Sequence, residues 1–228
     1  MSFKNLFEES ITQLYPNGVE WDLVGILTKT SKVYTLSYDS KILSGIFEIL
    51  CEPVISKIAN ENGYELKKAV QNQYPEFTIF KADKPNEKIA IDIKSTYRHR
   101  NPNGALKPFS FTLGSYKSYL QDPNGKKGIL FPYHEYSEHW VIGFIYDRNE
   151  NLKNIEIKSI IEAAQLEAPY SNIEYFIQEK YKVAGKLKGS GNTTNISSIK
   201  SADILDFRNG NGSFQTMQEF EEYWRNHK

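Results

Sequence analysis

Residues 73–97 constrain the fold more than any other part of this sequence, because they predict two adjacent strands that bring charged side chains together. Segments 77–80 and 89–93 are rich in β-branched and aromatic residues, which favour strands. The connection at 82–87 contains aspartate, proline and asparagine, which favour a turn. We therefore predict two strands of one sheet joined by a tight connection.

The second of these strands carries an Asp-x-Lys pattern. Side chains alternate along a strand, so Ala90, Asp92 and Lys94 share one face and the two intervening isoleucines face the other way. Glu76 precedes the first strand. Mg²⁺ prefers one or two carboxylates, and a lysine beside them can hold a water or stabilise a phosphoryl oxygen. The pattern indicates nuclease chemistry, and it leaves open an edge hairpin with solvated charges.

Composition limits the class of protein. The 228 residues suffice for one large domain or two small ones, and no linker or internal repeat divides them, so we predict a single domain over 1–228. No apolar run of about 18 residues predicts a membrane span, and the N-terminus lacks an apolar signal-peptide region. The single cysteine, Cys51, excludes an internal disulfide and a cysteine-based zinc site. We expect a cytoplasmic protein without membrane contact.

The formal net charge is zero, but the charges lie in blocks. Segment 94–127 has seven lysines and arginines against one acid, Asp122, and segment 180–200 has five lysines and no acid. Such blocks can form a basic groove for nucleic acid on a neutral protein. Solvated loops with excess lysine are the alternative.

Apolar spacing predicts the remaining elements. Helices are expected at 2–15 and 157–166, a short hairpin from strands 24–27 and 33–36, and further strands at 140–146, 173–177 and 182–184. A long helix is expected to begin at Asp39 or Ser40, to bend or divide at Pro53 and to end at Gly63. On this helix, Glu48 lies between apolar neighbours, so it can face the hairpin site or, alternatively, solvent.

Two polar segments suit nucleic-acid contact. Residues 71–73 are all amides, and residues 189–195 combine two glycines with small polar side chains. Glycine lets backbone approach a ligand closely, and the polar groups match base edges. We call residues 189–195 the recognition loop, although a flexible surface loop is an equally simple interpretation of its composition.

Several stretches resemble known enzymes in the same order along nearly the whole chain. They are Lys-Ile-Leu-Ser-Gly-Ile-Phe-Glu (41–48), Tyr-Pro-Glu-Phe-Thr-Ile-Phe-Lys (74–81), Asn-Glu-Lys-Ile-Ala-Ile-Asp-Ile-Lys (86–94), Phe-Thr-Leu-Gly (111–114), His-Trp-Val-Ile-Gly (139–143), Ala-Gly (184–185), Gly-Ser-Gly-Asn-Thr-Thr-Asn-Ile (189–196) and Tyr-Trp-Arg-Asn (223–226). The chain resembles the EcoRV-like type II restriction endonucleases of the PD-(D/E)xK nuclease superfamily. The resemblance implies an α/β fold with a mixed sheet flanked by helices, and a homodimer that clasps palindromic double-stranded DNA.

The resemblance also implies roles for individual residues. The catalytic group would be Glu76, Asp92 and Lys94, with Glu48 as an accessory acid. Mg²⁺ would be bound by Glu76, Asp92, the carbonyl of Ile93 and Glu48. The residues implied at the DNA are Gly189, Ser190, Gly191, Asn192, Thr193, Thr194 and Asn195 in the recognition loop, Gln71, Asn72 and Gln73 at the minor groove, and Ser40, Lys41, Thr96 and Tyr97 at the backbone.

One departure from the family pattern concerns the first acid, which is Glu76 where those enzymes have aspartate. The longer side chain must fold back, or its strand must lie further away, because Mg²⁺ requires near-ideal octahedral geometry. We expect an endonuclease that cuts a GATATC-like site to blunt ends with 5′-phosphates. The alternatives are a repair or junction-resolving nuclease, a binding-only protein whose metal site Glu76 has disabled, and a globular domain unrelated to DNA.

Overall fold

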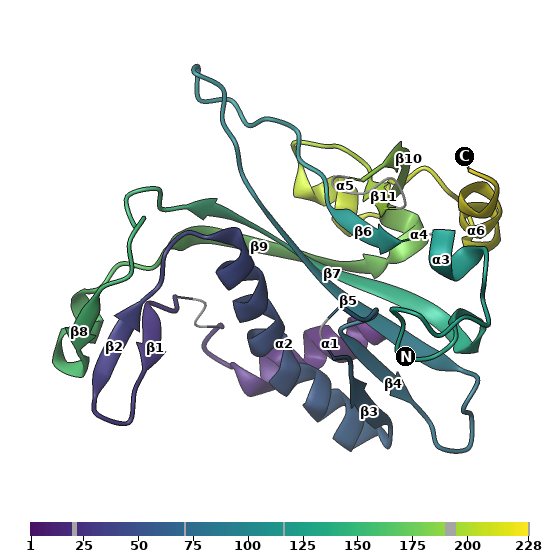
Figure 1. Ribbon diagram of the computed structural model, residues 1–228, viewed down its shortest axis with the longest axis horizontal. Helices are drawn as coiled ribbons and strands as arrows, with labels where there is room; N and C mark the ends of the chain where they lie inside the picture. The colour runs from purple at the N-terminus through teal and green to yellow at the C-terminus, as the bar shows by residue number, and fades with distance from the viewer. Residues whose placement is uncertain (20–21, 71, 116, 190–194, 228) are drawn as a thin grey trace.

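The computed structural model describes residues 1–19, 22–70, 72–115, 117–189 and 195–227, and its centre is a mixed five-stranded sheet (Figure 1). The strand order is β3 (Glu65–Lys68), β4 (Phe77–Phe80), β5 (Lys88–Tyr97), β7 (Tyr136–Arg148) and β9 (Tyr170–Glu179). Only β5 and β7 pair in parallel. The predicted mixed sheet flanked by helices is confirmed, and the predicted strand pair is β4 and β5.

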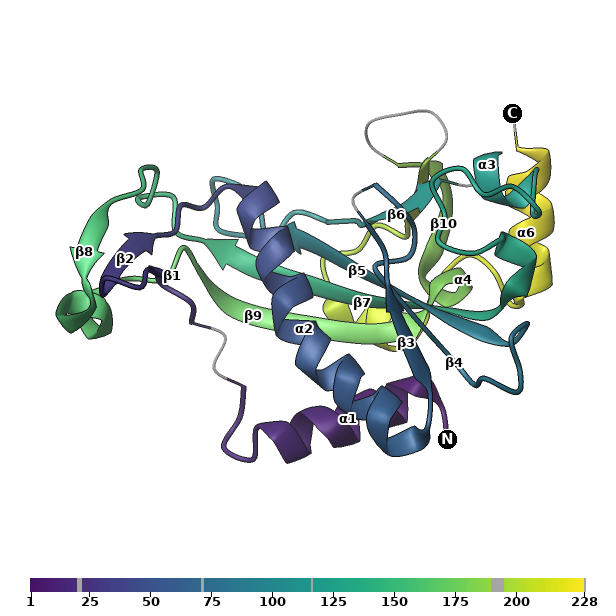
Figure 2. The same cartoon turned by 60° about the horizontal axis from the view of Figure 1, so that its bottom comes forward.

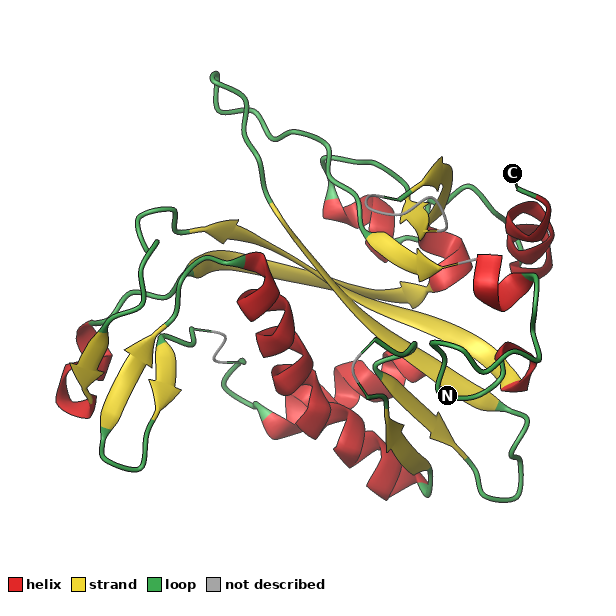
Figure 3. Ribbon diagram, in the orientation of Figure 1, coloured by secondary structure: helices red, strands yellow, loops and turns green. Residues whose placement is uncertain are grey.

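Two helices cover one face of this sheet, α1 (Phe3–Leu14) and α2 (Ser40–Asn62) (Figures 1 and 3). Asp39 caps α2 by accepting a hydrogen bond from the Lys41 amide, and Gly63 ends it in the left-handed conformation that glycine tolerates. The helix is continuous through Pro53, which excludes division, one of the two alternatives predicted there. Phe47 of α2 packs in one core cluster with Ile91 and Ile93 of β5. The prediction that these two isoleucines lie on one face of β5, opposite the face of Ala90, is thus confirmed.

The opposite face carries a smaller sheet and short helices. They are β6 (Thr112–Ser115), β10 (Ala184–Lys188), β11 (Asn195–Ser198), α3 (Lys117–Leu120), η1 (Tyr133–Glu135), α4 (Lys180–Val183), α5 (Ile204–Arg208) and α6 (Met217–Asn226). Ala90 of β5 packs in a second core cluster with Val141 and Phe176. Asp92 and Lys94 share the face of Ala90, so they point toward this layer at the end of the cluster.

A third sheet lies apart from the other two, at the left of Figure 1. It consists of β1 (Gly25–Leu27), β2 (Lys32–Thr35) and β8 (Ile157–Ser159), followed by the 3₁₀ helix η2 (Ile160–Gln165). The hairpin predicted at 24–36 is confirmed. The helix predicted at 157–166 is wrong at residues 157–159, which form β8, and the 3₁₀ helix η2 follows them. Pairing with β2 satisfies the backbone of β8, which outweighs the local helical pattern.

One further difference is local. The strand predicted at 182–184 is wrong, because α4 occupies 180–183 and β10 begins only at Ala184. Cys51 is a free cysteine buried in the core. Within the described ranges, no helix is both long enough and apolar enough to cross a membrane.

Candidate active site

The predicted acids and lysine meet at the place where β4 and β5 begin to separate. Lys94 Nζ donates hydrogen bonds to Asp92 Oδ1 at 2.8 Å and to Glu76 Oε1 at 3.0 Å. Glu76 Oε2 accepts a third hydrogen bond, at 3.0 Å, from the backbone N–H of Ile93. One ammonium therefore bridges two carboxylates, and the longer side chain of Glu76 folds against β5.

The strand register produces this arrangement. Phe77 pairs with Ile91 in the antiparallel β4–β5 ladder, so Glu76, one residue earlier, lies beside β5 near Asp92. Alternation along β5 then directs Asp92 and Lys94 to the same side of the strand. The three side chains meet because the hairpin fixes both their faces and their positions along the strands.

Burial and the neighbouring charges shift the pKa values of the two carboxyl groups in opposite directions. Burial, and then the neighbouring Glu76 carboxylate, raise the pKa of Asp92 well above its usual range, against the opposing charge of Lys94. Burial would also raise the pKa of Glu76, but the Lys94 ammonium and hydrogen bonds lower it to about 2. Desolvation opposes the charged form of Lys94, yet the two carboxylates raise its pKa above the usual value. Without a metal, Glu76 is thus the more readily ionised of the two carboxyl groups, and Asp92 holds its proton to a higher pH than an ordinary aspartate.

The donor set fits a hard divalent cation. Asp92 Oδ2 is buried and accepts no hydrogen bond from any described donor. Within the described residues, no three acidic, histidine or cysteine side chains are grouped closely enough to bind a metal ion. An ion here would therefore use the two carboxylates, the carbonyl of Ile93, and water or phosphate oxygens. Mg²⁺ is typically bound in this way, by one or two carboxylates with the remaining positions filled by water or phosphate.

Glu48 lies next to this group. It lines a pocket of about 230 Å³ together with Glu76, Lys68 and the segment before β4. Burial, and then the charge of Glu76, raise the pKa of Glu48, whereas Lys94 and Lys68 lower it. Glu48 therefore faces the hairpin site and not open solvent. Sequence reasoning missed Lys68, because nothing local to β3 shows that α2 packs opposite it.

The residues predicted at the DNA backbone occur at the ends of elements. Ser40 and Lys41 are exposed at the first turn of α2, and Thr96 and Tyr97 end β5. The guanidinium of Arg148 lies 3.7 Å from the centre of the Tyr97 ring. Figure 2 shows the start of α2, the β3–β4 connection and the ends of β10 and β11 on the same side of the molecule. One surface can thus present all these segments to a single ligand.

The predicted groove contacts are only partly described. Asn72 is exposed with a positive φ of 65°, and Gln73 Oε1 accepts a hydrogen bond from the Val70 amide at 3.3 Å. Gln71 and residues 190–194, which include Ser190, Gly191, Asn192, Thr193 and Thr194, lie outside the described residues.

The two ends of the recognition loop are joined. The N–H of Gly189 donates to the carbonyl of Asn195 at 2.8 Å, which closes the β10–β11 hairpin. A Cβ atom at position 189 would lie 2.9 Å from the carbonyl oxygen of Ile196, a distance that real side chains do not adopt. Glycine at this position therefore permits the close approach of the two strands.

Comparisons with known proteins agree with this geometry. A family model described as "Restriction endonuclease EcoRV" matches residues 17–228. The type II restriction enzyme EcoRV of Escherichia coli is 42% identical over 226 residues, which cover 98% of this chain and 89% of that protein. The match includes both strands of the candidate site and both ends of the recognition loop.

Proposed function

The chain belongs to the restriction endonuclease EcoRV family, and from this premise and the site geometry we propose that it is a Mg²⁺-dependent type II site-specific deoxyribonuclease. The family has the PD-(D/E)xK fold, which the mixed sheet and its flanking helices match. The observation that supports this proposal most is the Lys94 ammonium bridging Glu76 and Asp92 at hydrogen-bond distance. We propose that residues 1–228 act as one domain, in the cytoplasm, where its substrate would be DNA.

Each residue of the site has a distinct task in this proposal. Glu76, Asp92 and the carbonyl of Ile93 would hold Mg²⁺, which supplies Lewis acidity at the scissile phosphate and lowers the pKa of a bound water. Lys94 would then orient the attacking water and stabilise the negative charge that grows on the phosphoryl oxygens. Glu48, beside Glu76, could bind a second ion or a water of the first. Cleavage would leave 5′-phosphate and 3′-hydroxyl ends.

We propose a GATATC-like palindrome cut to blunt ends as the target, because the recognition loop resembles that of the family. The central TA step would be selected by its low cost of bending, without direct contact. Sequencing the ends of fragments from a plasmid of known sequence tests this proposal. Blunt ends that share a GATATC-like palindrome support the proposal. Ends that share a different palindrome show that the protein recognises that sequence instead. Ends without a common sequence favour a repair or junction-resolving nuclease.

Replacing Asn192 by alanine tests the recognition loop. We expect discrimination between the cognate site and a site with one changed base pair to fall by about 1–3 kcal/mol per lost base contact. Equilibrium binding of the two duplexes in Ca²⁺ measures this difference, with the absence of cleavage checked in the same samples. Unchanged discrimination would remove the loop from the proposed recognition surface.

We further propose that the protein is a homodimer, because two-fold symmetry matches a palindrome with one cut in each strand. The third sheet offers a surface for a second copy. Ile26 pairs with Tyr34, and Tyr34 pairs with Ile157, so the three form a row across β1, β2 and β8. Their exposed fractions are 64%, 44% and 58%. Such a contiguous apolar row is typical of a surface that another protein covers.

Replacing Ile157 by lysine tests this surface. A charge at the β8 end of the row should shift the protein from dimer to monomer, because burying it unpaired is unfavourable. Sedimentation at a fixed protein concentration measures the change. The matched control is Leu205→Lys, an exposed apolar residue in α5, which should leave the mass unchanged. A dimer that persists in Ile157→Lys would place the interface elsewhere.

A further inference from the structure

Lys180 is a buried lysine close to the candidate active site. It is the first of the lysines expected to form a basic surface block, yet only 4% of it is exposed. Within the described residues, no carboxylate oxygen lies within 4.0 Å of its Nζ. Burying most of a lysine side chain without an ion-pair partner for its ammonium is unfavourable for stability. The surface-block interpretation is therefore wrong for Lys180, and its burial needs another explanation.

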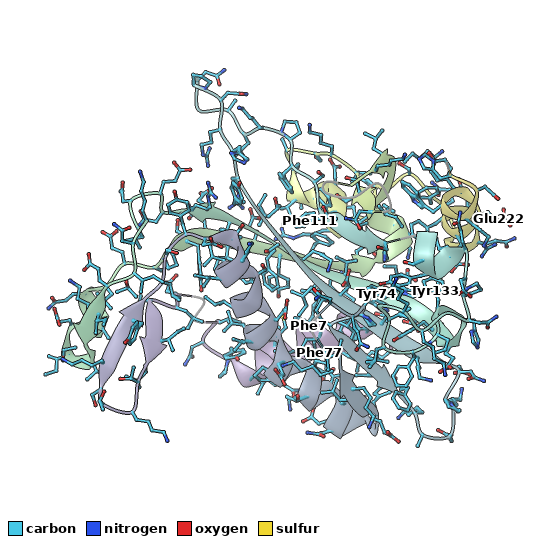
Figure 4. The ribbon with its side chains drawn as sticks, in the orientation of Figure 1. Phe7, Tyr74, Phe77, Phe111, Tyr133 and Glu222 are labelled. Atoms are coloured by element: carbon cyan, nitrogen blue, oxygen red, sulfur yellow. The ribbon has the colours of Figure 1, made fainter. Side chains whose placement is uncertain are left out.

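The Lys180 ammonium lies over the ring of Tyr74. Nζ lies 4.4 Å from the ring centre, and the Tyr74 hydroxyl is within 2.7 Å of His139 Nδ1. Tyr133, which lies near Tyr74 in Figure 4, stacks on His139 at 4.6 Å. Tyr74 precedes Glu76 by two residues. Lys180 thus packs on the segment that places the first acid of the site.

Lys180 also lies on the side of the central sheet that bears Asp92. Asp92 pairs with Val141 and Val141 pairs with Gln178, so these three residues form one row across the sheet. Lys180 follows Gln178 by two positions. Burial lowers the pKa of Lys180 to about 8; the charge of Asp92 opposes this, and Lys94 adds to it. The acids of the site thus offset only part of the effect of burial on Lys180, from beyond direct ion-pair distance.

The position of Lys180 in the chain links the site to the recognition loop. Lys180 is the first residue of α4, and β10 follows α4 directly. The last residue of β10 is the one immediately before Gly189. The segment 180–189 is anchored along its length, because the N–H groups of Gly212 and Ser213 donate to the carbonyls of Lys182 and Ala184. A short stretch of chain thus joins Lys180 to Gly189, the first residue of the recognition loop.

We propose that Lys180 is a positioning residue, whose buried ammonium holds the Tyr74 ring and the Asp92 carboxylate in place and connects them to the recognition loop. It acts through these two residues and does not touch the scissile phosphate. The inference rests on the proposed function, because it assigns Lys180 a part in cleavage of the recognised site.

The test compares Lys180→Met with Lys182→Met. Lys182 lies on the same short helix, but it is partly exposed and pairs with Glu179, so it controls for loss of a lysine from α4. The measurements are the single-turnover cleavage rate in Mg²⁺, the Kd for the cognate duplex in Ca²⁺ and the Tm without metal. Lys180→Arg, which keeps the positive charge, is measured alongside.

We expect Lys180→Met to cleave about 10- to 100-fold more slowly, because small displacements of a reacting group have effects of this size. Its Kd should stay within about twofold of the wild-type value. Its Tm should be unchanged or higher, because replacing an unpaired buried charge by an apolar side chain of similar length is neutral or stabilising. Lys180→Arg should recover part of the rate, and Lys182→Met should match the wild type in the single-turnover rate and in Tm.

Two outcomes would overturn the inference alone. One is a Lys180→Met protein that cleaves within twofold of the wild-type rate. The other is a lower Tm with a matching loss of DNA binding in both Lys180 variants, which would make Lys180 a packing residue. A wild-type protein that leaves cognate DNA intact in Mg²⁺ would overturn the proposed function, and the inference with it.

Discussion

Replacing Lys94 by alanine is expected to abolish DNA cleavage while leaving specific DNA binding largely intact. Lys94 is the single cation that contacts both Glu76 and Asp92 in the described structure. Its loss removes the group that would orient water and stabilise charge in the transition state, an interaction worth about 10²–10³-fold in rate. Single-turnover cleavage in Mg²⁺ and duplex binding in Ca²⁺ measure the two effects separately.

The matched control for this variant is Lys84→Ala. Lys84 lies in the β4–β5 connection, is exposed and pairs with Glu87, so its loss should change neither cleavage nor binding. A Lys94→Ala protein that cleaves normally would remove Lys94 from the reaction. One that loses binding together with cleavage would show that Lys94 acts in binding DNA and not in the chemical step.

Replacing Asp92 by asparagine is expected to have a similarly large effect on cleavage and the opposite effect on stability. The carboxylate is a proposed metal ligand, and asparagine offers a neutral oxygen in its place, so cleavage should fall by at least about 10²-fold. In the metal-free protein, however, Asp92 is a buried acid whose pKa is raised, first by burial and then by Glu76. Removing it should therefore stabilise the fold.

The sign of this effect depends on pH. Between the ordinary aspartate pKa of about 3.9 and the raised pKa of the folded state, the folded protein binds more protons than the unfolded chain. The free energy of unfolding of the wild type should therefore fall as pH rises through this window. The free energy of unfolding of Asp92→Asn should not fall in this way. Its excess over the wild-type value should therefore grow with pH and then level off. Denaturant unfolding in EDTA at several pH values from about 4 to 8 measures it.

An Asp92→Asn protein with the same pH dependence of stability as the wild type would contradict the assigned protonation of the site. Adding Mg²⁺ provides a second comparison. The ion would displace the proton of Asp92 in the wild type, so it should raise the wild-type Tm more than the Tm of Asp92→Asn.

The sequence was sufficient for the local part of the site. Alternation along β5 predicted that Asp92 and Lys94 share a face, and the proline and turn residues around β4 predicted the hairpin that brings Glu76 to them. These features depend on neighbours within about 20 residues, whose geometry is fixed by strand periodicity. The apolar stripe of α2 likewise depends on local spacing alone.

The missed features depend on contacts between distant segments. Lys180 lies in a run of lysines, and only the packing of α4 beside Tyr74 shows that it is buried. Lys68 joins the pocket of Glu48 because β3 lies opposite α2. Residues 157–159 form a strand because β2 offers a pairing edge. No local sequence pattern predicts these partners. Contacts with distant segments can outweigh the local preference for helix or strand.

The central claim is that a site with glutamate at position 76 cleaves DNA in the presence of Mg²⁺. We would incubate a plasmid of known sequence with the protein in Mg²⁺ and, in parallel, measure binding of the mapped duplex in Ca²⁺, with EDTA as the control. We predict discrete fragments in Mg²⁺ and none in EDTA. An intact plasmid in Mg²⁺, together with sequence-specific binding in Ca²⁺, would contradict the account and identify a DNA-binding protein whose metal site Glu76 has disabled.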